Sequence, residues 1–304
     1  MIENVNVSVV IPVLNAERYL PELLEAIFGQ SVEVREVILV DSMSTDATAV
    51  IAAKHKRVRV VPIEKFSHGR ARNLGAREAD GEVIALLTQD ALPSGKNWLS
   101  ELIAPLDDEK VAATFSRQVP RADANPMERY FLQTHFPSGE QVVMCKDGER
   151  PLAFQREVFL SNVSAVVRRD TLLRFPFDEE LIMSEDQQFA RDVLEAGYAV
   201  VYCPSSVVIH SHNYSLKTVF QRYFDSVYSV TKLFKSHKMK DSAAMGMKYL
   251  WKEALFILRH YPLWTFYYIF YTMAKSVGTL TGHFADKLPR RLVRRMSMHS
   301  YYWE

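Results

Sequence analysis

A short run of mostly apolar residues, Glu82 to Leu87, ends abruptly in the polar stretch Thr88-Gln89-Asp90. Gly81 precedes the run and Pro93 follows it, which is the pattern of a β-strand covered on both faces. In open α/β sheets, ligands bind outside the carboxyl ends of such strands. Asp90 is therefore expected at a ligand site, although Asp also commonly begins a turn that binds nothing.

The residues before this run alternate between strand and helix patterns. Apolar runs at 7–13, 37–40 and 58–63 predict strands, and the intervening stretches predict the connecting helices. Strands that alternate with helices form a mostly parallel sheet with right-handed crossovers. Asn15, Asp41 and Asp90 each follow a predicted strand, so they are expected at one edge of an α/β sheet.

Two further polar clusters lie later in the chain. Ser184 with Gln187 fits a helix capping box, in which Glu185 and Asp186 would meet the positive end of the helix dipole. That explanation of the two acids needs no ligand. A pair of histidines, His210-Ser-His212, follows a short predicted strand at 207–209, and two histidines in this place favour a ligand site.

Charge is distributed unevenly along the chain. Residues 216–304 contain 15 Lys and Arg against 5 Asp and Glu, so from totals of 37 and 36 the first 215 residues carry 22 against 31. The uncharged aromatic stretch Tyr261 to Ala274 has 14 residues, fewer than the roughly 20 that span a bilayer unless the run continues through Lys275. Aromatics near the Arg cluster of Leu288 to Arg295 suit a helix that lies in the headgroup region of an anionic membrane. The alternative is an interface between domains or between copies of the chain in a homo-oligomer.

The sequence also indicates whether nucleic acid is a partner and which compartment the protein occupies. No nucleic-acid recognition module accompanies the basic part, so nucleic acid is not expected as a partner. Cys145 and Cys203 show neither metal-site nor redox-motif spacing, which indicates a reducing, cytosolic compartment.

Four motifs in order resemble those of family 2 inverting glycosyltransferases with the GT-A fold. They are VSVVIPVLNAERYL, VILVDSMSTDAT, HGRARNLGAREADGEVIALLTQDA and MSEDQQFARDVLEAGY, and the resemblance covers about residues 5–215. Within that family, the HG-x-x-RN and LTQDA forms, together with the final LPRRL and SMHSYYW, look most like bacterial rhamnosyltransferases of surface-polysaccharide assembly. The resemblance implies a GT-A domain at 1–215, with a donor half at about 1–120 and an acceptor half at about 121–215. An all-α, membrane-associating region would follow at 216–304.

The resemblance also implies a set of site residues. The donor-binding residues would be Pro12, Leu14, Asn15, Glu17, Asp41, Arg72, Asn73, Thr88, Gln89 and Asp90. Asp90 and His210 would hold a divalent cation, Mg²⁺ or Mn²⁺, and Glu185 and Asp186 would be the catalytic pair. Two positions depart from the family pattern: Thr88 replaces the first Asp of the Asp-x-Asp motif, and Leu14 stands where an aromatic residue is common.

The chemistry of glycosyl transfer explains why these residue types are needed. A cation on the donor diphosphate neutralises the charge that develops on the leaving group, and one carboxylate accepts the proton of the attacking hydroxyl. One base without a protein nucleophile means a single displacement with inversion. The start of the helix is expected to lower the pKa of Asp186, the implied base.

The sequence therefore predicts an enzyme, a hexosyltransferase. Its expected donor is dTDP-L-rhamnose and its expected acceptor a lipid-linked saccharide, in O-antigen, capsule or cell-wall polysaccharide synthesis at the cytoplasmic face of the bacterial inner membrane. A UDP-hexose or UDP-N-acetylhexosamine donor is the alternative within the fold. The alternative of another class is a non-catalytic membrane scaffold with a degenerate metal site.

Overall fold

The computed structural model describes residues 5–146, 158–234 and 239–303, with the backbone alone at 239–245. Its strands are β1 (Val7–Val13), β2 (Val34–Asp41), β3 (Val58–Pro62), β4 (Val83–Leu87), β5 (Leu92–Pro93), β6 (Val111–Val119), β7 (Val142–Met144), β8 (Ser164–Arg168) and β9 (Ala199–Ile209). Its α-helices are α1 (Leu20–Phe28), α2 (Thr48–Ala52), α3 (His68–Glu78), α4 (Trp98–Ile103), α5 (Pro126–His135), α6 (Arg169–Arg174), α7 (Glu185–Glu195), α8 (Leu216–Leu233), α9 (Met239–His260), α10 (Thr265–His283) and α11 (Arg290–Met296). Short 3₁₀ turns are η1 (Ala104–Asp107), η3 (Pro262–Trp264), η4 (Ala285–Lys287) and η5 (Ser300–Trp303).

The strands form one sheet in the order β3-β2-β1-β4-β8-β6-β9-β5, with β7 paired to β9. Neighbours from β3 to β4 are parallel, which confirms the α/β architecture expected from the alternating pattern. Beyond β4 the sheet is mixed, because β8 runs antiparallel to both β4 and β6 while β9 runs parallel to β6. The ends of β1, β2 and β4 therefore meet at one edge.

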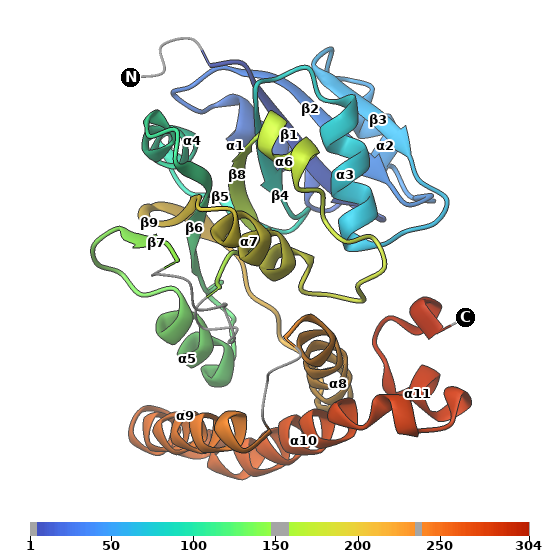
Figure 1. Cartoon of the computed structure of the whole chain (residues 1–304), viewed down its shortest axis with the longest axis vertical. Coiled ribbons are helices and arrows are strands. Elements are labelled where there is room, and N and C mark those ends of the chain that lie inside the picture. The colour runs from blue at the N-terminus through green and yellow to red at the C-terminus, as the bar shows by residue number, and fades with distance from the viewer. Residues whose placement is uncertain (1–4, 147–157, 235–238, 304) are drawn as a thin grey trace.

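Helices cover both faces of the sheet (Figure 1). Alternate side chains of β1 point to opposite faces, so Val9 and Ile11 pack with α1, α2 and α4 while Val10 packs with α3, α6 and α7. Burial on both sides explains why the strands read as continuous apolar runs.

The helix that carries Glu185 and Asp186 begins differently from expectation. Ser184 has a left-handed backbone, with φ 66°, and its side chain makes no capping hydrogen bond, so the predicted capping box is wrong. The backbone carbonyl of Ser184 instead accepts from the N–H of Gln188 at 3.0 Å. The first turn of α7 thus presents its two acids without a side-chain cap beside them.

The C-terminal helices form a separate layer. In Figure 1, α9 and α10 lie at one end of the molecule, with α8 between them and the sheet. The close approach of α10 to α8 depends on two glycines: a Cβ at Gly278 or Gly282 would lie 2.4 Å from the carbonyl oxygen of Phe220 or Phe224. After α10 the chain turns back, and its end lies on the side that carries α3 (Figure 1). Within the described residues, every helix is too short or too polar to cross a membrane.

Candidate active site

A cleft of about 1350 Å³ opens at the sheet edge where β1, β2 and β4 end. Five of the residues implied as donor-binding line it: Pro12, Leu14, Arg72, Thr88 and Gln89. The loop before α3, Glu179 and Glu180, Tyr228 of α8 and several C-terminal residues between Ala285 and Trp303 also line it. The cleft is thus built partly from the end of the chain that sequence reasoning assigned to a separate region.

The polar residues after β1 and β2 shape two loops rather than line this cleft. The side-chain oxygen of Asn15 accepts from the N–H of Thr45 at 2.9 Å, and the carboxylate of Glu17 accepts from the N–H of Ala47 at 2.9 Å. Asp41 accepts from both the N–H and the hydroxyl of Ser44, at 3.1 and 2.5 Å. These bonds hold the two loops together beside the cleft, where Ser42 is the residue that faces it.

Gln89 joins the ends of β1 and β4. Its side-chain oxygen accepts from the N–H of Leu14 at 2.8 Å, and its amide donates to the carbonyl of Leu14 at 3.2 Å. The Leu14 side chain remains 51% exposed. The neighbouring Thr88 hydroxyl is buried without a hydrogen-bond partner among the described groups.

Asn73 is a buried structural residue in this conformation. Its amide donates to the carbonyl of Phe177 at 2.8 Å, and its side-chain oxygen accepts from the N–H of Phe177 at 3.0 Å. Asn73 therefore fixes the segment before α7 and does not line the cleft.

Arg72 and Glu185 form a buried ion pair. The guanidinium Nη1 of Arg72 lies 3.0 Å from Oε1 of Glu185, and the amide of Asn162 donates to the same oxygen at 3.3 Å. Burial raises the pKa of Glu185, but the charge of Arg72, the ring of His68 and hydrogen bonds to the carboxylate together outweigh burial and hold that pKa below its ordinary value. Glu185 is therefore a fixed negative charge, engaged by Arg72.

Asp186 has the opposite character. Its carboxylate accepts one hydrogen bond from the backbone N–H of the adjacent Gln187, at 2.8 Å, and one from the backbone N–H of Asn162, at 3.4 Å. Burial and the adjacent charge of Glu185 nevertheless raise the pKa of Asp186 to about 7. The expectation that the helix start would lower this pKa is wrong, because desolvation and a like charge outweigh the helix dipole. A carboxyl group with this pKa can take up and release a proton near neutral pH.

Asp90, His210 and His212 form a cluster in which one ligand atom from each residue lies within 4.8 Å of the others. Nε2 of His210 is 3.7 Å from one carboxylate oxygen of Asp90, and Nε2 of His212 is 3.5 Å from the other. The opposite ring nitrogen of His210 bonds the side chain of Gln118 at 3.0 Å, which orients the ring. Burial lowers the pKa of His210 to about 3 and also lowers that of His212, so both rings are neutral and can act as ligands.

Asp186 and the turn that leads to Asp90 contact the same part of the chain. The N–H of Thr88, two residues before Asp90, donates to the carbonyl of Val163 at 3.1 Å. The N–H of the adjacent Asn162 donates to Asp186. Residues 162–163 therefore connect the implied base with the turn that carries the implied metal ligand.

Some residues of the site were not identified from the sequence. His212 belongs to the H-x-H pair that favours a ligand site, but the resemblance implies only His210 as a ligand, and His68 lies in the HGRARN motif without an implied role. His68 lines the cleft, and its ring lies 5.3 Å from that of His299 near the C-terminus. No local pattern indicates Asn162 or Gln118, because their roles depend on contacts with residues 23 to 92 positions away.

Comparisons with known proteins identify the family of the chain. Residues 8–172 match the model of glycosyl transferase family 2. The chain is 33% identical to the O-antigen chain rhamnosyltransferase RfbN of Salmonella typhimurium, over 98% of this chain and 96% of the relative. It is 32% identical to the O-antigen chain rhamnosyltransferase WbaN of Salmonella anatum, over 93% of this chain and 90% of the relative. Among solved structures, the mannosyltransferase PcManGT of Pyrobaculum calidifontis, in complex with GDP-Man and Mn²⁺, has a TM-score of 0.63 at 19% identity, covering 92% of this chain and 88% of that one. The chain therefore belongs to glycosyl transferase family 2 and is a glycosyltransferase.

Proposed function

We propose that this glycosyltransferase moves L-rhamnose from dTDP-L-rhamnose to a lipid-linked saccharide during synthesis of a bacterial surface polysaccharide. The observation that carries the proposal is the similarity to two O-antigen chain rhamnosyltransferases over nearly the whole length of both chains. That similarity extends beyond the family motifs to the C-terminal helices and the residues that return to the cleft. It therefore includes parts of the chain that line the cleft beside β1 and β4.

The donor is tested with a panel of nucleotide sugars. Binding raises the melting temperature according to ligand concentration over the dissociation constant. We expect dTDP-L-rhamnose and dTDP to stabilise the protein at concentrations at which UDP-glucose and UDP-N-acetylglucosamine do not. Stabilisation by a UDP-sugar alone would overturn the assignment of rhamnose while leaving the glycosyltransferase class intact.

Asp186 is the proposed general base. Its pKa of about 7 suits a group that accepts the proton of the acceptor hydroxyl as that oxygen attacks the anomeric carbon. The new carbon–oxygen bond forms as the bond to the diphosphate breaks, and the leaving group keeps the electron pair. Attack opposite the leaving group inverts the anomeric carbon. Glu185 acts indirectly, by holding Arg72 and by raising the pKa of Asp186.

Asp90, His210 and His212 are the proposed ligands of a divalent cation. One carboxylate and two neutral imidazoles fit Mn²⁺ better than Mg²⁺, which prefers an all-oxygen set. When bound, the cation would neutralise charge on the donor diphosphate. The Thr88 hydroxyl, in place of a second carboxylate, leaves the histidines to complete the site.

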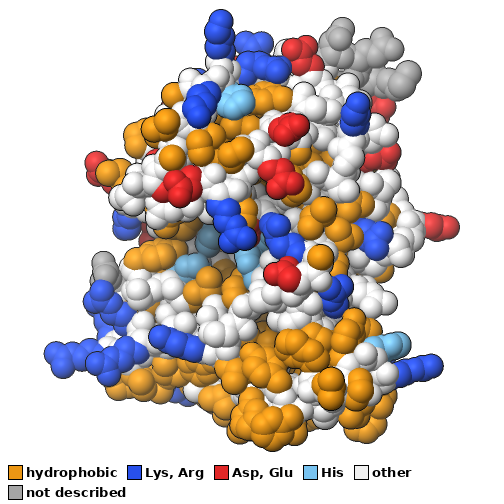
Figure 2. Space-filling view, turned by 180° about the vertical axis from the view of Figure 1, so that it is seen from behind, with side chains coloured by type: hydrophobic (Ala, Val, Ile, Leu, Met, Phe, Trp, Pro, Cys, Tyr) orange, Lys and Arg blue, Asp and Glu red, His pale blue; other side chains and the backbone are white. Residues whose placement is uncertain are grey.

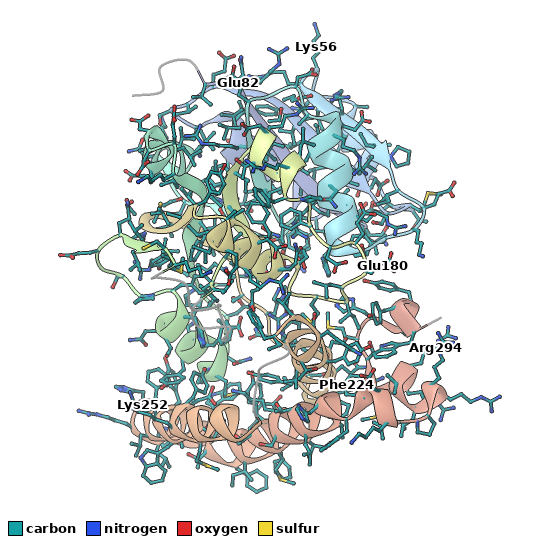
Figure 3. The ribbon with its side chains drawn as sticks, viewed as in Figure 1. Lys56, Glu82, Glu180, Phe224, Lys252 and Arg294 are labelled. Carbon is teal, nitrogen blue, oxygen red and sulfur yellow. The ribbon has the colours of Figure 1, made fainter. Side chains whose placement is uncertain are left out.

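The outer face of α9, η3 and α10 is the proposed membrane contact. Large apolar side chains are exposed along it: Met247, Trp251, Leu255, Leu258, Leu263, Phe266, Ile269, Phe270, Met273, Val277 and Leu280. Figure 2 shows them gathered at one end of the molecule, and Figure 3 shows Lys252 and Arg294 at the two ends of this layer. An exposed apolar face that is bordered by basic side chains fits contact with an anionic membrane better than exposure to water alone.

Sedimentation with vesicles tests this contact. Leu263 is 95% exposed, so Leu263→Asp removes apolar contact without disturbing the core. We expect the variant to bind vesicles of anionic lipid less than the unaltered chain does, whereas Val50→Asp, at an exposed apolar position of α2, binds normally. Equal binding by all three proteins would exclude this face, and a concentration-dependent dimer lost in Leu263→Asp would assign it to self-association instead.

A further inference from the structure

The last residues of the chain form a structured wall of the donor cleft. We name residues 285–303, which comprise η4, α11 and η5, the C-terminal strap. Tyr301, Tyr302 and Trp303 line the same cleft as Leu14 and Thr88. The ring of Tyr301 packs edge-on against Phe66, with centroids 6.2 Å apart, and the ring of His299 packs against His68 at 5.3 Å. The strap thus contacts the loop before α3 and the first residue of that helix.

Specific bonds to α8 hold the strap in place. The buried carboxylate of Asp225 accepts from the N–H groups of Met298 at 2.8 Å and His299 at 3.2 Å. The side-chain amide of Gln221 donates to the carbonyl of Ser297 at 3.0 Å. The ring of Trp303 lies 4.8 Å from that of Tyr228, also on α8. These contacts fix the backbone of the strap and leave its aromatic side chains at the cleft.

The cleft has an aromatic surface on the strap and lacks one on β1. Leu14 is exposed where the family resemblance leads us to expect an aromatic side chain, and Leu cannot stack on a planar ring. Tyr301, by contrast, is 40% exposed. Flat aromatic side chains in a nucleotide-binding cleft offer stacking faces to any base.

Three residues that line the cleft also carry polar groups that lack partners. The Trp303 Nε1–H, the Arg72 Nε–H and the Thr88 hydroxyl are all buried without a hydrogen-bond partner among the described residues. Unpaired buried donors are costly, so such groups beside one cleft are consistent with a ligand that brings acceptor oxygens. A nucleoside diphosphate combines those acceptors with a flat base.

We propose that the C-terminal strap is part of the donor site, in which Tyr301 and Trp303 hold the nucleoside of the donor in place of the stacking residue that Leu14 does not provide. The inference rests on the proposed use of a nucleotide-sugar donor. It assigns a substrate-binding role to the C-terminal end of the chain, apart from any role of α9 and α10 at a membrane.

The test measures binding of dTDP, and separately of inorganic pyrophosphate, to the full chain by titration calorimetry with Mn²⁺ present. We expect Tyr301→Ala and Trp303→Leu each to weaken dTDP binding about tenfold, within the range of one stacking contact, and Tyr301→Phe to retain it. Leu292→Ala is the matched control, because Leu292 is an exposed strap residue that does not line the cleft. Pyrophosphate binding should be the same in all of these proteins, since it has no nucleoside.

Initial rates complete the test. With the strap variants we expect the KM for the donor to rise about tenfold, while the KM for the acceptor and kcat stay within about twofold of the unaltered enzyme. If the unaltered chain binds dTDP and Tyr301→Ala binds it equally well, the strap inference is overturned and the proposed function stands. An equal loss of pyrophosphate binding would also overturn it, because the strap would then act on the whole site. Failure of the unaltered chain to bind any nucleoside diphosphate would overturn the proposed function and this inference together.

Discussion

The protonation of Asp186 should control how the reaction rate depends on pH. Its pKa is raised to about 7, and a general base must be deprotonated to act. We therefore expect kcat/KM to fall below pH 7 along a limb of unit slope, about tenfold between pH 7.5 and pH 6. The measurement is the initial rate of nucleoside diphosphate release from pH 5.5 to 9, with subsaturating donor. A rate that stays constant down to pH 5.5, as a carboxylate of ordinary pKa near 4 would give, would refute the assignment.

A substitution at Glu185 tests the cause of that shift. Glu185→Gln removes the negative charge that raises the pKa of Asp186 and leaves the positive charge of Arg72 unneutralised, and both effects favour the charged form of Asp186. The acid limb of the pH dependence of kcat/KM should move to lower pH by about one unit or more. We expect this displacement whether or not the substitution also lowers the maximal rate. Glu195→Gln, at the other end of α7, is the control and should leave the midpoint unchanged. An identical midpoint in Glu185→Gln would show that the charge of Glu185 does not contribute to the raised pKa of Asp186.

The same shift has a consequence for stability. Because the folded-state pKa of about 7 lies above the ordinary value of 3.8, the folded protein binds this proton more tightly than the unfolded chain. The charged carboxylate therefore lowers the free energy of unfolding above pH 7, and the penalty is relieved as the pH falls from about 7 toward 4. A difference of about three pKa units corresponds to about 4 kcal/mol as an upper limit. Asp186→Asn should abolish transfer yet melt at a higher temperature than the unaltered chain at pH 8, with the gap closing near pH 5. A lower melting temperature at pH 8 would contradict the buried charge.

Two further substitutions test the metal ligands and the helix packing. His212→Ala should reduce the stabilisation that Mn²⁺ gives in thermal melts by removing one of three ligand groups, whereas His55→Ala, outside the cluster, should not; equal stabilisation in both would remove His212 from the site. Gly282→Ala should lower the free energy of unfolding by about 1–3 kcal/mol, because the added Cβ would lie 2.4 Å from the carbonyl oxygen of Phe224. Gly246→Ala, where nothing lies within 4 Å, is the control, and equal chemical denaturation of the two variants would refute the close contact.

The parts of the site that were predicted from sequence depend on local patterns. Apolar runs defined β1, β2 and β4, and the polar residue after each strand then had to lie at one edge. His210 follows β9 in the same way, which is why its proximity to Asp90 could be expected. The pKa of Asp186 could not be predicted, because it depends on the burial of α7 and on the charge of Glu185, which Arg72 holds from α3.

The role of α8 could not be predicted either, since it depends on contacts distant in sequence. This helix carries Asp225, which holds the C-terminal strap, and Phe224, whose carbonyl contacts the glycine face of α10. It therefore connects the exposed apolar face with the proposed donor cleft. A truncation after Gly246 would remove α10 and the strap at once, so a loss of both vesicle binding and transfer in that protein could not be assigned to either. Single substitutions separate the two: Leu263→Asp should reduce vesicle binding while dTDP binding persists, and Tyr301→Ala should do the reverse. Parallel loss of both properties in either variant would mean that α8 couples the two surfaces energetically.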